Sequence, residues 1–234
     1  MKAVILAGGQ GTRLAPYTTV LPKPLMPVGD MPIIEIVIRQ LARYGFDDIT
    51  LAVGHLAELL MAYCGNGTKY DLKLSYSREE TPLGTAGPIT LIPNLNETFL
   101  VMNGDVLTTL DFSDMWRFHH ERGAIATLAT CQRDVKIDLG VIESDANDRV
   151  TNYIEKPTFH YSVSTGIYVF EPAILNYIIP GQRLDLPELM LRLLQQGQQV
   201  NCYSYNGYWL DIGRYDDYET ANREFEARRQ EFLL

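Results

Sequence analysis

The chain has 234 residues, a formal net charge of −9, and a composition of 46% hydrophobic and 21% charged residues. This length suits one sizeable domain, and the composition is typical of an ordinary soluble globular protein. The acidic balance argues against a nucleic-acid partner, because neutralising a phosphate backbone needs a basic patch. No apolar run approaches the length of a bilayer span, so we expect no membrane partner.

The three cysteines, Cys64, Cys131 and Cys202, lie far apart and form no CxxC pair. This spacing is typical of free thiols in a reducing compartment and argues against a structural zinc site. The first residues, MKAVILAGG, are too short for a signal peptide and lack a cleavage site. We therefore expect a cytoplasmic protein that begins with a buried strand.

The first half of the chain alternates short apolar strands with helical patterns. Strands are predicted at Ala3–Gly8, Asp48–Gly54, Asp71–Ser77, Phe99–Asp105 and 124–132, with helices at 32–45, 55–65 and 111–123. Repeated strand–helix–strand units predict an α/β fold of Rossmann-like type, a mainly parallel sheet with helices on both faces. Ligands bind such sheets at the carboxyl ends of the strands, where a glycine-rich loop follows the first strand here.

The second half changes its pattern. A hairpin is predicted at 139–157 with SDAND as its turn, followed by a strand at Ser164–Phe170. Helices are predicted at 172–178 and 186–197, a polar turn at the end of the segment 201–213, and a last amphipathic helix at Tyr215–Phe232. Because no repeat or Gly/Ser-rich linker interrupts the chain, we expect residues 1–234 to form a single domain with a small β lobe.

The glycine-rich loop runs from Gly8 to Leu14, in the order GGQGTRL. It does not match the dinucleotide fingerprint GxGxxG, because Leu14 stands where the third glycine would be, and no P-loop Gly-Lys-Ser/Thr follows. Glycine-rich turns also occur without ligands, but Arg13 and Lys23 favour a phosphate site here. Two prolines flank Lys23, which suits a lysine that is held in place for a ligand.

The stretch LAGGQGTRLAPYTTVLPKPLMPVGDMPIIE closely resembles the signature of the sugar-1-phosphate nucleotidyltransferases, also called NDP-sugar pyrophosphorylases. EETPLGTAGP, NGD, LGVIE, EKP, TGIYVF and WLDIG follow in the family's order, so the resemblance extends from Met1 to about Asn222. It implies a nucleotide-binding part at 1–132, a sugar-binding part at 133–213 and a C-terminal helix at 214–234. The implied reaction joins a nucleoside triphosphate to a sugar 1-phosphate and releases pyrophosphate.

This reaction needs alignment and charge neutralisation rather than a protein nucleophile, because a sugar phosphate is itself a nucleophile near neutral pH. The resemblance implies that Asp105 and Asp211 hold Mg²⁺, although a strand end and a helix cap remain alternatives for these two aspartates. It implies a nucleotide-binding set of Leu6, Ala7, Gly8, Gly9, Gln10, Gly11, Thr12, Arg13, Lys23, Pro82, Gly84, Thr85, Ala86, Asn103 and Gly104.

The resemblance also implies a sugar-phosphate site formed by Gly140, Glu155, Lys156, Thr165 and Gly166. Glu155 would accept hydrogen bonds from sugar hydroxyls and Lys156 would contact the phosphate, while an exposed charge pair is the alternative for both. The family often has Asn-Ala-Gly where this chain has Ser-Thr-Gly, which leaves the sugar open. Arg13, Lys23, Asp105, Lys156 and Asp211 are the implied catalytic residues.

EETPLGTAGP most resembles the guanylyltransferases that use mannose-like sugar 1-phosphates, which favours GTP and a mannose-like or heptose substrate. Uridylyl and thymidylyl transfer and a phosphocholine acceptor are alternatives within this chemistry. A catalytically silent nucleotide-sugar sensor is the alternative from another class, but it would be expected to lack some of the charged residues that this chain keeps. Some relatives dimerise through the core or the last helix, so a homodimer is compatible with the resemblance. No left-handed β-helix domain is expected, because the chain ends at Leu234.

Overall fold

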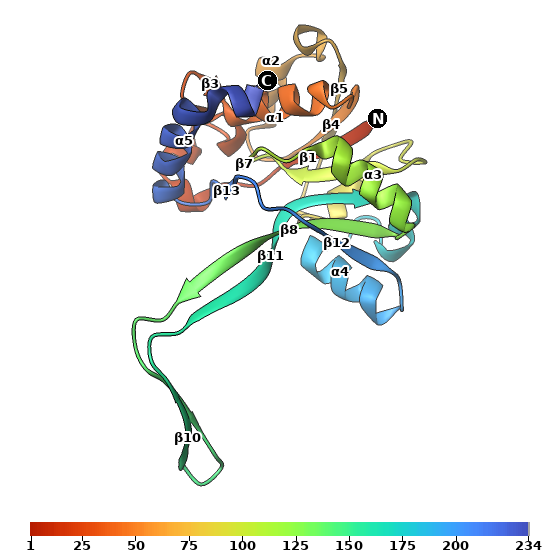
Figure 1. The fold of residues 1–234 in the computed structure, drawn as a ribbon. Helices are drawn as coiled ribbons and strands as arrows, with labels where there is room; N and C mark the ends of the chain where they lie inside the picture. The colour runs from red at the N-terminus through yellow and green to blue at the C-terminus, as the bar shows by residue number, and fades with distance from the viewer. Residues whose placement is uncertain (234) are drawn as a thin grey trace.

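A central seven-stranded sheet organises the computed structural model, which describes residues 1–233 (Figure 1). Its strand order is β12 (Val200–Ser204), β8 (Ala126–Lys136), β11 (Thr158–Phe170), β6 (Phe99–Asn103), β1 (Lys2–Ala7), β4 (Asp48–Val53) and β5 (Lys73–Arg78). β11 runs antiparallel to both of its neighbours, and the remaining pairs are parallel. The predicted mainly parallel sheet is therefore confirmed.

The sheet is covered by helices on both faces because successive residues of its central strands point to opposite sides. Ala3 and Ile5 of β1 belong to a core shared with α1 (Ile33–Arg43), α2 (Ala57–Cys64), α3 (Phe112–Arg122) and α5 (Tyr215–Leu233). Val4 belongs to a second core with α4 (Leu186–Gln195) and the 3₁₀ helices η5 (Gly87–Leu91) and η6 (Pro172–Tyr177). The prediction of helices on both faces is confirmed.

Several predicted elements differ in detail from those observed. The helix expected at 172–178 is the 3₁₀ helix η6. The strand expected at Phe99–Asp105 ends at Asn103, and after a turn the chain forms β7 (Val106–Thr108). β7 pairs with β13 (Trp209–Asp211), a short strand formed by residues for which only a polar turn was predicted. This pairing joins two segments that are distant in the sequence.

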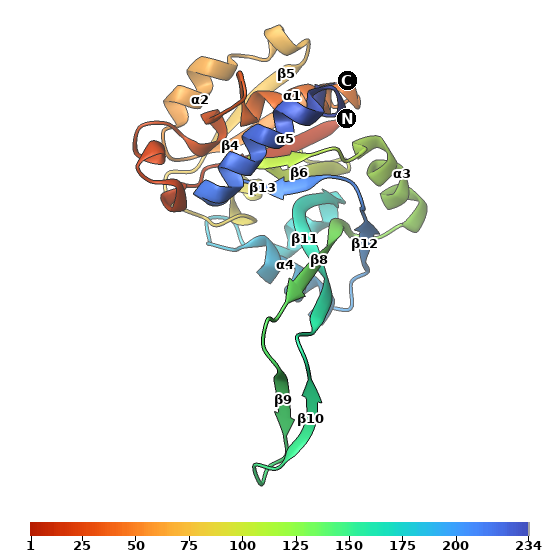
Figure 2. The same ribbon diagram turned by 60° about the vertical axis from the view of Figure 1, so that its left-hand side comes forward.

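The strands β8 and β11 continue beyond the sheet as a two-stranded ribbon that leads to the hairpin of β9 (Val141–Ser144) and β10 (Val150–Ile154), as Figure 2 shows. We call residues 133–163 the arm. The hairpin was predicted, and its turn is closed by hydrogen bonds between Asp145 and Arg149. All of the arm is described by the structure, and none of it belongs to either core cluster. The arm therefore projects from the body of the molecule (Figures 1 and 2).

The C-terminal helix α5 holds the segment that follows Lys23. That segment contains η3 (Lys23–Leu25) and the short strands β2 (Pro27–Val28) and β3 (Met31–Pro32). Asn222 accepts a hydrogen bond from the Gly29 amide at 2.9 Å, and the Tyr218 hydroxyl donates to the Pro27 carbonyl at 2.6 Å. None of the helices within residues 1–233 combines the length and the apolar character that crossing a bilayer demands.

Candidate active site

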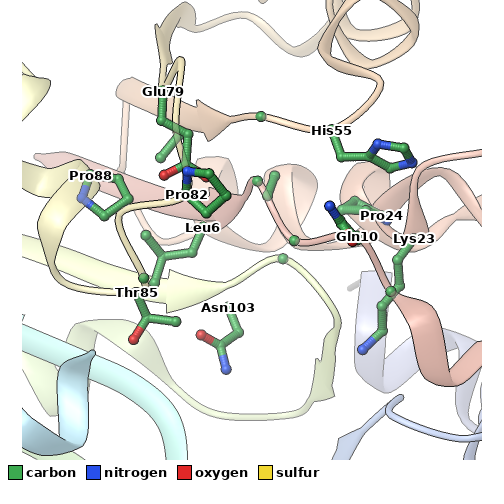
Figure 3. A pocket seen from close by; sticks show the side chains of 18 of the residues that line it. Leu6, Gln10, Lys23, Pro24, His55, Glu79, Pro82, Thr85, Pro88 and Asn103 are labelled. Atoms are coloured by element: carbon green, nitrogen blue, oxygen red, sulfur yellow. The ribbon is translucent and has the colours of Figure 1, made fainter. Parts of the chain in front are cut away.

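A cavity of about 1280 Å³ opens at the carboxyl ends of β1, β4, β5 and β6. It lies at the edge of the sheet where parallel α/β folds bind ligands. Figure 3 shows Gln10 and Lys23 at one end of the cavity and Pro82 and Thr85 at the other. It is lined by Leu6, Ala7, Gly8, Gly9, Gln10, Gly11, Thr12, Arg13, Lys23, Pro24, Ala52, Gly54, His55, Arg78, Glu79, Glu80, Thr81, Pro82, Gly84, Thr85, Pro88, Asn103, Gly104, Asp105, Arg183 and Asp185.

The glycine-rich loop leaves β1 and forms one wall of this cavity. Gly11 has φ = 64°, a conformation that favours glycine, and its carbonyl accepts a hydrogen bond from the Thr18 hydroxyl at 2.8 Å. The Gly8 carbonyl accepts from the His55 amide at 3.2 Å, which fixes the start of the loop against the end of β4. Gly9 is exposed, and a Cβ placed there would meet no atom within 4 Å. The loop is thus open to a ligand at Gly9.

Lys23 reaches the centre of the site from η3. Its Nζ bonds Oδ2 of Asp105, and the two side chains are 10% and 21% exposed. The rest of η3 explains the position of Lys23, because Pro24 and Leu25 are buried and hold Lys23 against the sheet. A cation is therefore fixed at the end of β6, beside a carboxylate.

Asp211 is brought to the same place by the pairing of β7 with β13. Asp211 lies opposite Val106, and the Ile212 amide donates to the Asp105 carbonyl at 3.1 Å. Burial raises the pKa of the Asp211 carboxyl, and the nearby Asp105 charge adds to this, while Lys23 and Arg13 oppose it. The structure thus brings together Arg13, Lys23, Asp105 and Asp211.

The two aspartates suit a Mg²⁺ ion that completes its coordination with water and substrate phosphates. Oδ1 of Asp105 is buried and has no hydrogen-bond partner among the described residues. Such a group is costly to bury unless a ligand satisfies it. Within residues 1–233, no three His, Cys, Asp or Glu side chains gather as a set that could hold a metal alone. The donor set therefore fits an ion bound partly through its substrate.

The other end of the cavity is formed by the loop after β5. Oε2 of Glu79 accepts a hydrogen bond from the Leu83 amide at 2.9 Å, and Oε1 lies so near Gly8 that a Cβ there would be 2.6 Å from it. Gly84 and Thr85 line the cavity, but Ala86 does not. Ala86 is fully buried, and its amide donates to the Leu184 carbonyl at 2.9 Å. Its amide is thus already bonded within the protein.

Of the residues expected to bind the sugar phosphate, Gly166 adjoins a cavity-lining residue, although neither it nor Thr165 lines the cavity itself. Gly166 has φ = 75°, and a Cβ there would be 2.6 Å from Nδ2 of Asn103, which lines the cavity. Thr165 is 1% exposed, and its hydroxyl donates to the Ala129 carbonyl at 2.9 Å. Its carbonyl accepts from the Trp209 indole at 2.8 Å. The Thr165 side chain therefore packs within the fold.

The remaining predicted sugar-site residues, Gly140, Glu155 and Lys156, lie on the arm and do not line the cavity. The Glu155 and Lys156 side chains are both 60% exposed, and Nζ of Lys156 is 4.0 Å from Oε1 of Glu155. The Tyr153 hydroxyl donates to Glu155 at 3.1 Å, and a Cβ on Gly140 would collide with Tyr153. These residues thus gather at the joint between the ribbon and the terminal hairpin.

Several cavity residues were given no binding role of their own from the sequence, above all Glu79, Arg183 and Asp185. Glu79 directly follows β5, so the rule that ligands bind at the carboxyl ends of parallel strands was a usable signal. Arg183 and Asp185 belong to the loop before α4, which no strand or glycine pattern marks. Only the folded chain places that loop at the cavity.

Comparison with known proteins identifies the family. The family model described as "Nucleotidyl transferase" matches residues 2–228. The chain belongs to the nucleotidyl transferase family. The match covers both the glycine-rich loop and the arm, so the resemblance seen in the motifs is confirmed.

Curated relatives from several organisms support this family assignment. The chain is 36% identical to a UTP–glucose-1-phosphate uridylyltransferase of Synechocystis sp., over 97% of this chain and 64% of that protein. It is 34% identical to a mannose-1-phosphate guanyltransferase of Schizosaccharomyces pombe, over 94% of this chain and 63% of that protein. The chain therefore spans less than two thirds of the length of these relatives.

Two solved structures share the fold. A protein from Bacillus anthracis, described as a "Putative Glucose-1-Phosphate Thymidylyltransferase" in complex with a sucrose, superposes with a TM-score of 0.78 and 25% identity. The match covers 96% of this chain and 94% of that one. HddC of Yersinia pseudotuberculosis has a TM-score of 0.74 at 24% identity, covering 96% of this chain and 99% of its own, which shows the fold alone. The fold class predicted for this chain is therefore confirmed.

Proposed function

We propose that this chain transfers a nucleotidyl group from a nucleoside triphosphate to a sugar 1-phosphate, with release of pyrophosphate. The observation that carries this proposal is the convergence of Arg13, Lys23, Asp105 and Asp211 beside the glycine-rich loop in a family of nucleotidyl transferases. The curated relatives named above, one a uridylyltransferase and one a guanyltransferase, both act on a sugar 1-phosphate according to their names. The same class of acceptor is the simplest inference for this chain.

The residues present can align the reactants without a protein nucleophile. The open amides of the loop at Gly8–Gly11 and the Arg13 guanidinium would hold the triphosphate, since both donate hydrogen bonds to phosphate oxygens. Lys23 would stabilise the negative charge that develops as the pyrophosphate leaves. Asp105 and Asp211 would hold Mg²⁺, which neutralises phosphate charge when it is bound. The sugar phosphate then attacks in line, and the bond between the α- and β-phosphates breaks.

We assign the sugar phosphate to Glu155 and Lys156, in keeping with the resemblance. Both side chains are exposed at the joint of the arm and do not line the cavity, so this assignment rests on the resemblance and requires the arm to bring them to the bound nucleotide. Lys156 would supply a cation to the sugar phosphate, and Glu155 would accept hydrogen bonds from sugar hydroxyls. Gly166, packed against Asn103, would border the sugar on the side of the body.

We further propose that the preferred base is guanine. Glu79 places a carboxylate at the end of the cavity away from Lys23 (Figure 3). Guanine presents two neighbouring donors, N1–H and N2–H₂, and a carboxylate accepts hydrogen bonds from both. Uracil and thymine present a single N–H between two carbonyls, which suits a carboxylate less well. The mannose-1-phosphate guanyltransferase relatives agree with this choice, and the uridylyltransferase relative supports UTP as the alternative.

The deciding experiment measures pyrophosphate release with Mg²⁺ for GTP, UTP and dTTP, each paired with sugar 1-phosphates of manno and gluco configuration. Selective turnover of GTP with a manno-configured or heptose phosphate supports the whole proposal. Selective turnover of UTP or dTTP would keep the reaction and overturn the base. Tight nucleotide binding without release in any pairing would favour a silent nucleotide-sugar sensor.

A single substitution tests the base assignment separately. Glu79→Gln exchanges one acceptor oxygen for a donor, so KM for GTP should rise by about tenfold to a hundredfold, as expected when a buried donor loses its partner. KM for the sugar phosphate should stay unchanged. Glu80→Gln, the neighbouring cavity residue, is the matched control. An equal effect of both substitutions would contradict the special role of Glu79.

A further inference from the structure

Two segments that are distant in the sequence are joined at the cavity end that we assign to the nucleoside. The loop at 83–87 follows β5, and the loop at 184–186 begins α4. The Leu184 amide donates to the Leu83 carbonyl at 3.0 Å, and the Leu184 carbonyl accepts from the Ala86 and Gly87 amides at 2.9 and 3.1 Å. Leu83 and Leu184 are 7% and 3% exposed, so water competes little for these bonds. The backbones thus form one unit.

Two side chains, those of Asp185 and Thr85, complete this junction, because each bonds the backbone of the other's loop. Asp185 occupies the N-cap position of α4, but its side chain makes no capping bond to its own helix. Its Oδ1 instead accepts a hydrogen bond from the Thr85 amide at 3.1 Å. The Thr85 hydroxyl accepts from the Leu186 amide at 2.7 Å, so Thr85 caps α4 from the other loop. The same hydroxyl lies 3.5 Å from Oδ1 of Asp185.

Gly84 lies between these hydrogen-bonded groups, where there is no room for a Cβ. Gly84 has φ = 79°, and a Cβ there would lie 2.6 Å from Oδ1 of Asp185 and 2.6 Å from the Leu184 carbonyl oxygen. Gly84, Thr85 and Asp185 all line the cavity, and Figure 3 shows Thr85 at the end opposite Lys23. The wall of the cavity at this end is therefore shaped by a carboxylate that belongs to the loop before α4.

We propose that Asp185 is a positioning residue that fixes the Gly84–Thr85 turn for recognition of the nucleoside. In this arrangement the Thr85 hydroxyl is bonded to α4 and the Thr85 amide to Asp185, so the ligand would be met by the other backbone groups of the turn, such as those of Gly84. This inference rests on the proposed function, because it assumes that the nucleoside occupies this end of the cavity and the triphosphate the end at Lys23. Asp185 acts through the turn and has no part in the chemical step.

The decisive measurement is the dissociation constant of the nucleotide, obtained by calorimetry without a sugar phosphate. The probes are GTP, UTP and dTTP, with inorganic tripolyphosphate as a probe of the phosphate end. For the nucleotide that the wild-type protein binds most tightly, Asp185→Ala should raise the dissociation constant about tenfold, the usual effect of losing one partly buried hydrogen bond. Binding of tripolyphosphate should stay unchanged, because Gly8–Gly11 and Lys23 are untouched.

Matched variants separate positioning from general damage. Asp185→Asn keeps an acceptor oxygen for the Thr85 amide and should restore nucleotide binding, and Thr85→Ser should do the same by keeping the hydroxyl. Thr85→Val removes the hydroxyl that accepts from the Leu186 amide and should also weaken nucleotide binding, and the double variant, which loses both this bond and the Thr85 amide–Asp185 bond, should bind more weakly than either single variant. Asp111→Ala removes the aspartate that caps α3 away from the cavity and should leave nucleotide binding intact.

Three outcomes would overturn the inference: unchanged nucleotide binding by Asp185→Ala, an equal loss of tripolyphosphate binding, or an equal loss of nucleotide binding by Asp111→Ala. Nucleotide binding by the wild type without pyrophosphate release would overturn the proposed reaction and leave this inference standing. A wild-type protein that binds none of the three nucleotides would overturn both.

Discussion

The Lys23 ammonium bonds one oxygen of the Asp105 carboxylate across 82 positions of sequence, inside the cavity. The other oxygen of Asp105 is buried and makes no hydrogen bond to any residue that the structure describes. The lysine thus neutralises the carboxylate while one of its oxygens stays free. This relationship gives one aspartate two partners, a fixed cation of the protein and the metal ion that we propose.

Replacing Lys23 should lower both activity and stability. Lys23→Met keeps the length of the side chain and removes its charge, so turnover should fall by at least about a hundredfold, the usual cost of losing a charge that stabilises a transition state. It should also lower the free energy of unfolding by about 3 kcal/mol, because the mostly buried Asp105 carboxylate loses its partner. Denaturant unfolding and pyrophosphate release measure the two effects.

The double variant Lys23→Met/Asp105→Asn is the control for this prediction. It should regain stability, because no unpaired charge remains, and it should stay inactive. Full activity in Lys23→Met would refute the role given to this lysine.

Asp211→Asn should inactivate the protein and stabilise it. Burial and the neighbouring Asp105 charge raise the pKa of Asp211, so the ionised carboxylate is unfavourable in the folded state near neutral pH. The asparagine removes this cost, and the melting temperature should rise at pH 7. Turnover should be lost with the metal-binding charge. Thermal unfolding and pyrophosphate release, measured on the same samples, check the prediction, and a lower melting temperature would contradict it.

Two glycines of the loop should respond differently to alanine. Gly9→Ala should leave the melting temperature unchanged, because its Cβ meets no atom within 4 Å, yet it should weaken nucleotide binding by filling space that the ligand needs. Gly11→Ala should cost about 1 to 2 kcal/mol of stability, because φ = 64° is unfavourable for alanine. Calorimetry of unfolding and of nucleotide binding distinguishes the two. Unchanged binding in Gly9→Ala would mean that the ligand avoids this loop.

Stability should depend on His119 in mildly acidic solution. The buried ring lies 2.8 Å from the Thr127 hydroxyl and 3.1 Å from Glu171, and burial lowers its pKa below 6.5 despite the carboxylate. The unfolded chain therefore binds the proton more tightly, and the free energy of unfolding should fall as the pH drops below about 6.5. Urea unfolding between pH 7 and 5 measures this slope.

His119→Gln should reduce the slope, whereas His120→Gln, a change at the adjacent exposed histidine, should keep it. Identical slopes in the wild type and in His119→Gln would show that other groups cause the pH dependence.

Much of the fold was predictable because its signals are local. Apolar strands alternate with amphipathic helices, and Gly45 and Gly123 lie at helix ends. This pattern indicated a sheet with a layer of helices on each face. β13 was missed because three residues give too weak a pattern, and its pairing with β7 depends on a contact about a hundred residues away in sequence. η6 was expected as a regular helix because periodicity alone does not separate α from 3₁₀ geometry in so short a segment.

For the candidate site, the sequence by itself was enough to predict the phosphate end that we propose. The run from Gly8 to Lys23 carries its glycines, arginine and lysine on one continuous segment, so local residue chemistry was enough to predict a phosphate site there. The family resemblance implied that Asp105 and Asp211 act together, but the tertiary structure decided how these and other distant groups reach the site. Asp105 and Asp211 meet through a β-ladder, and Asp185 reaches Thr85 through the packing of α4. Such contacts depend on how the whole sheet and its helices pack, and no local pattern encodes them.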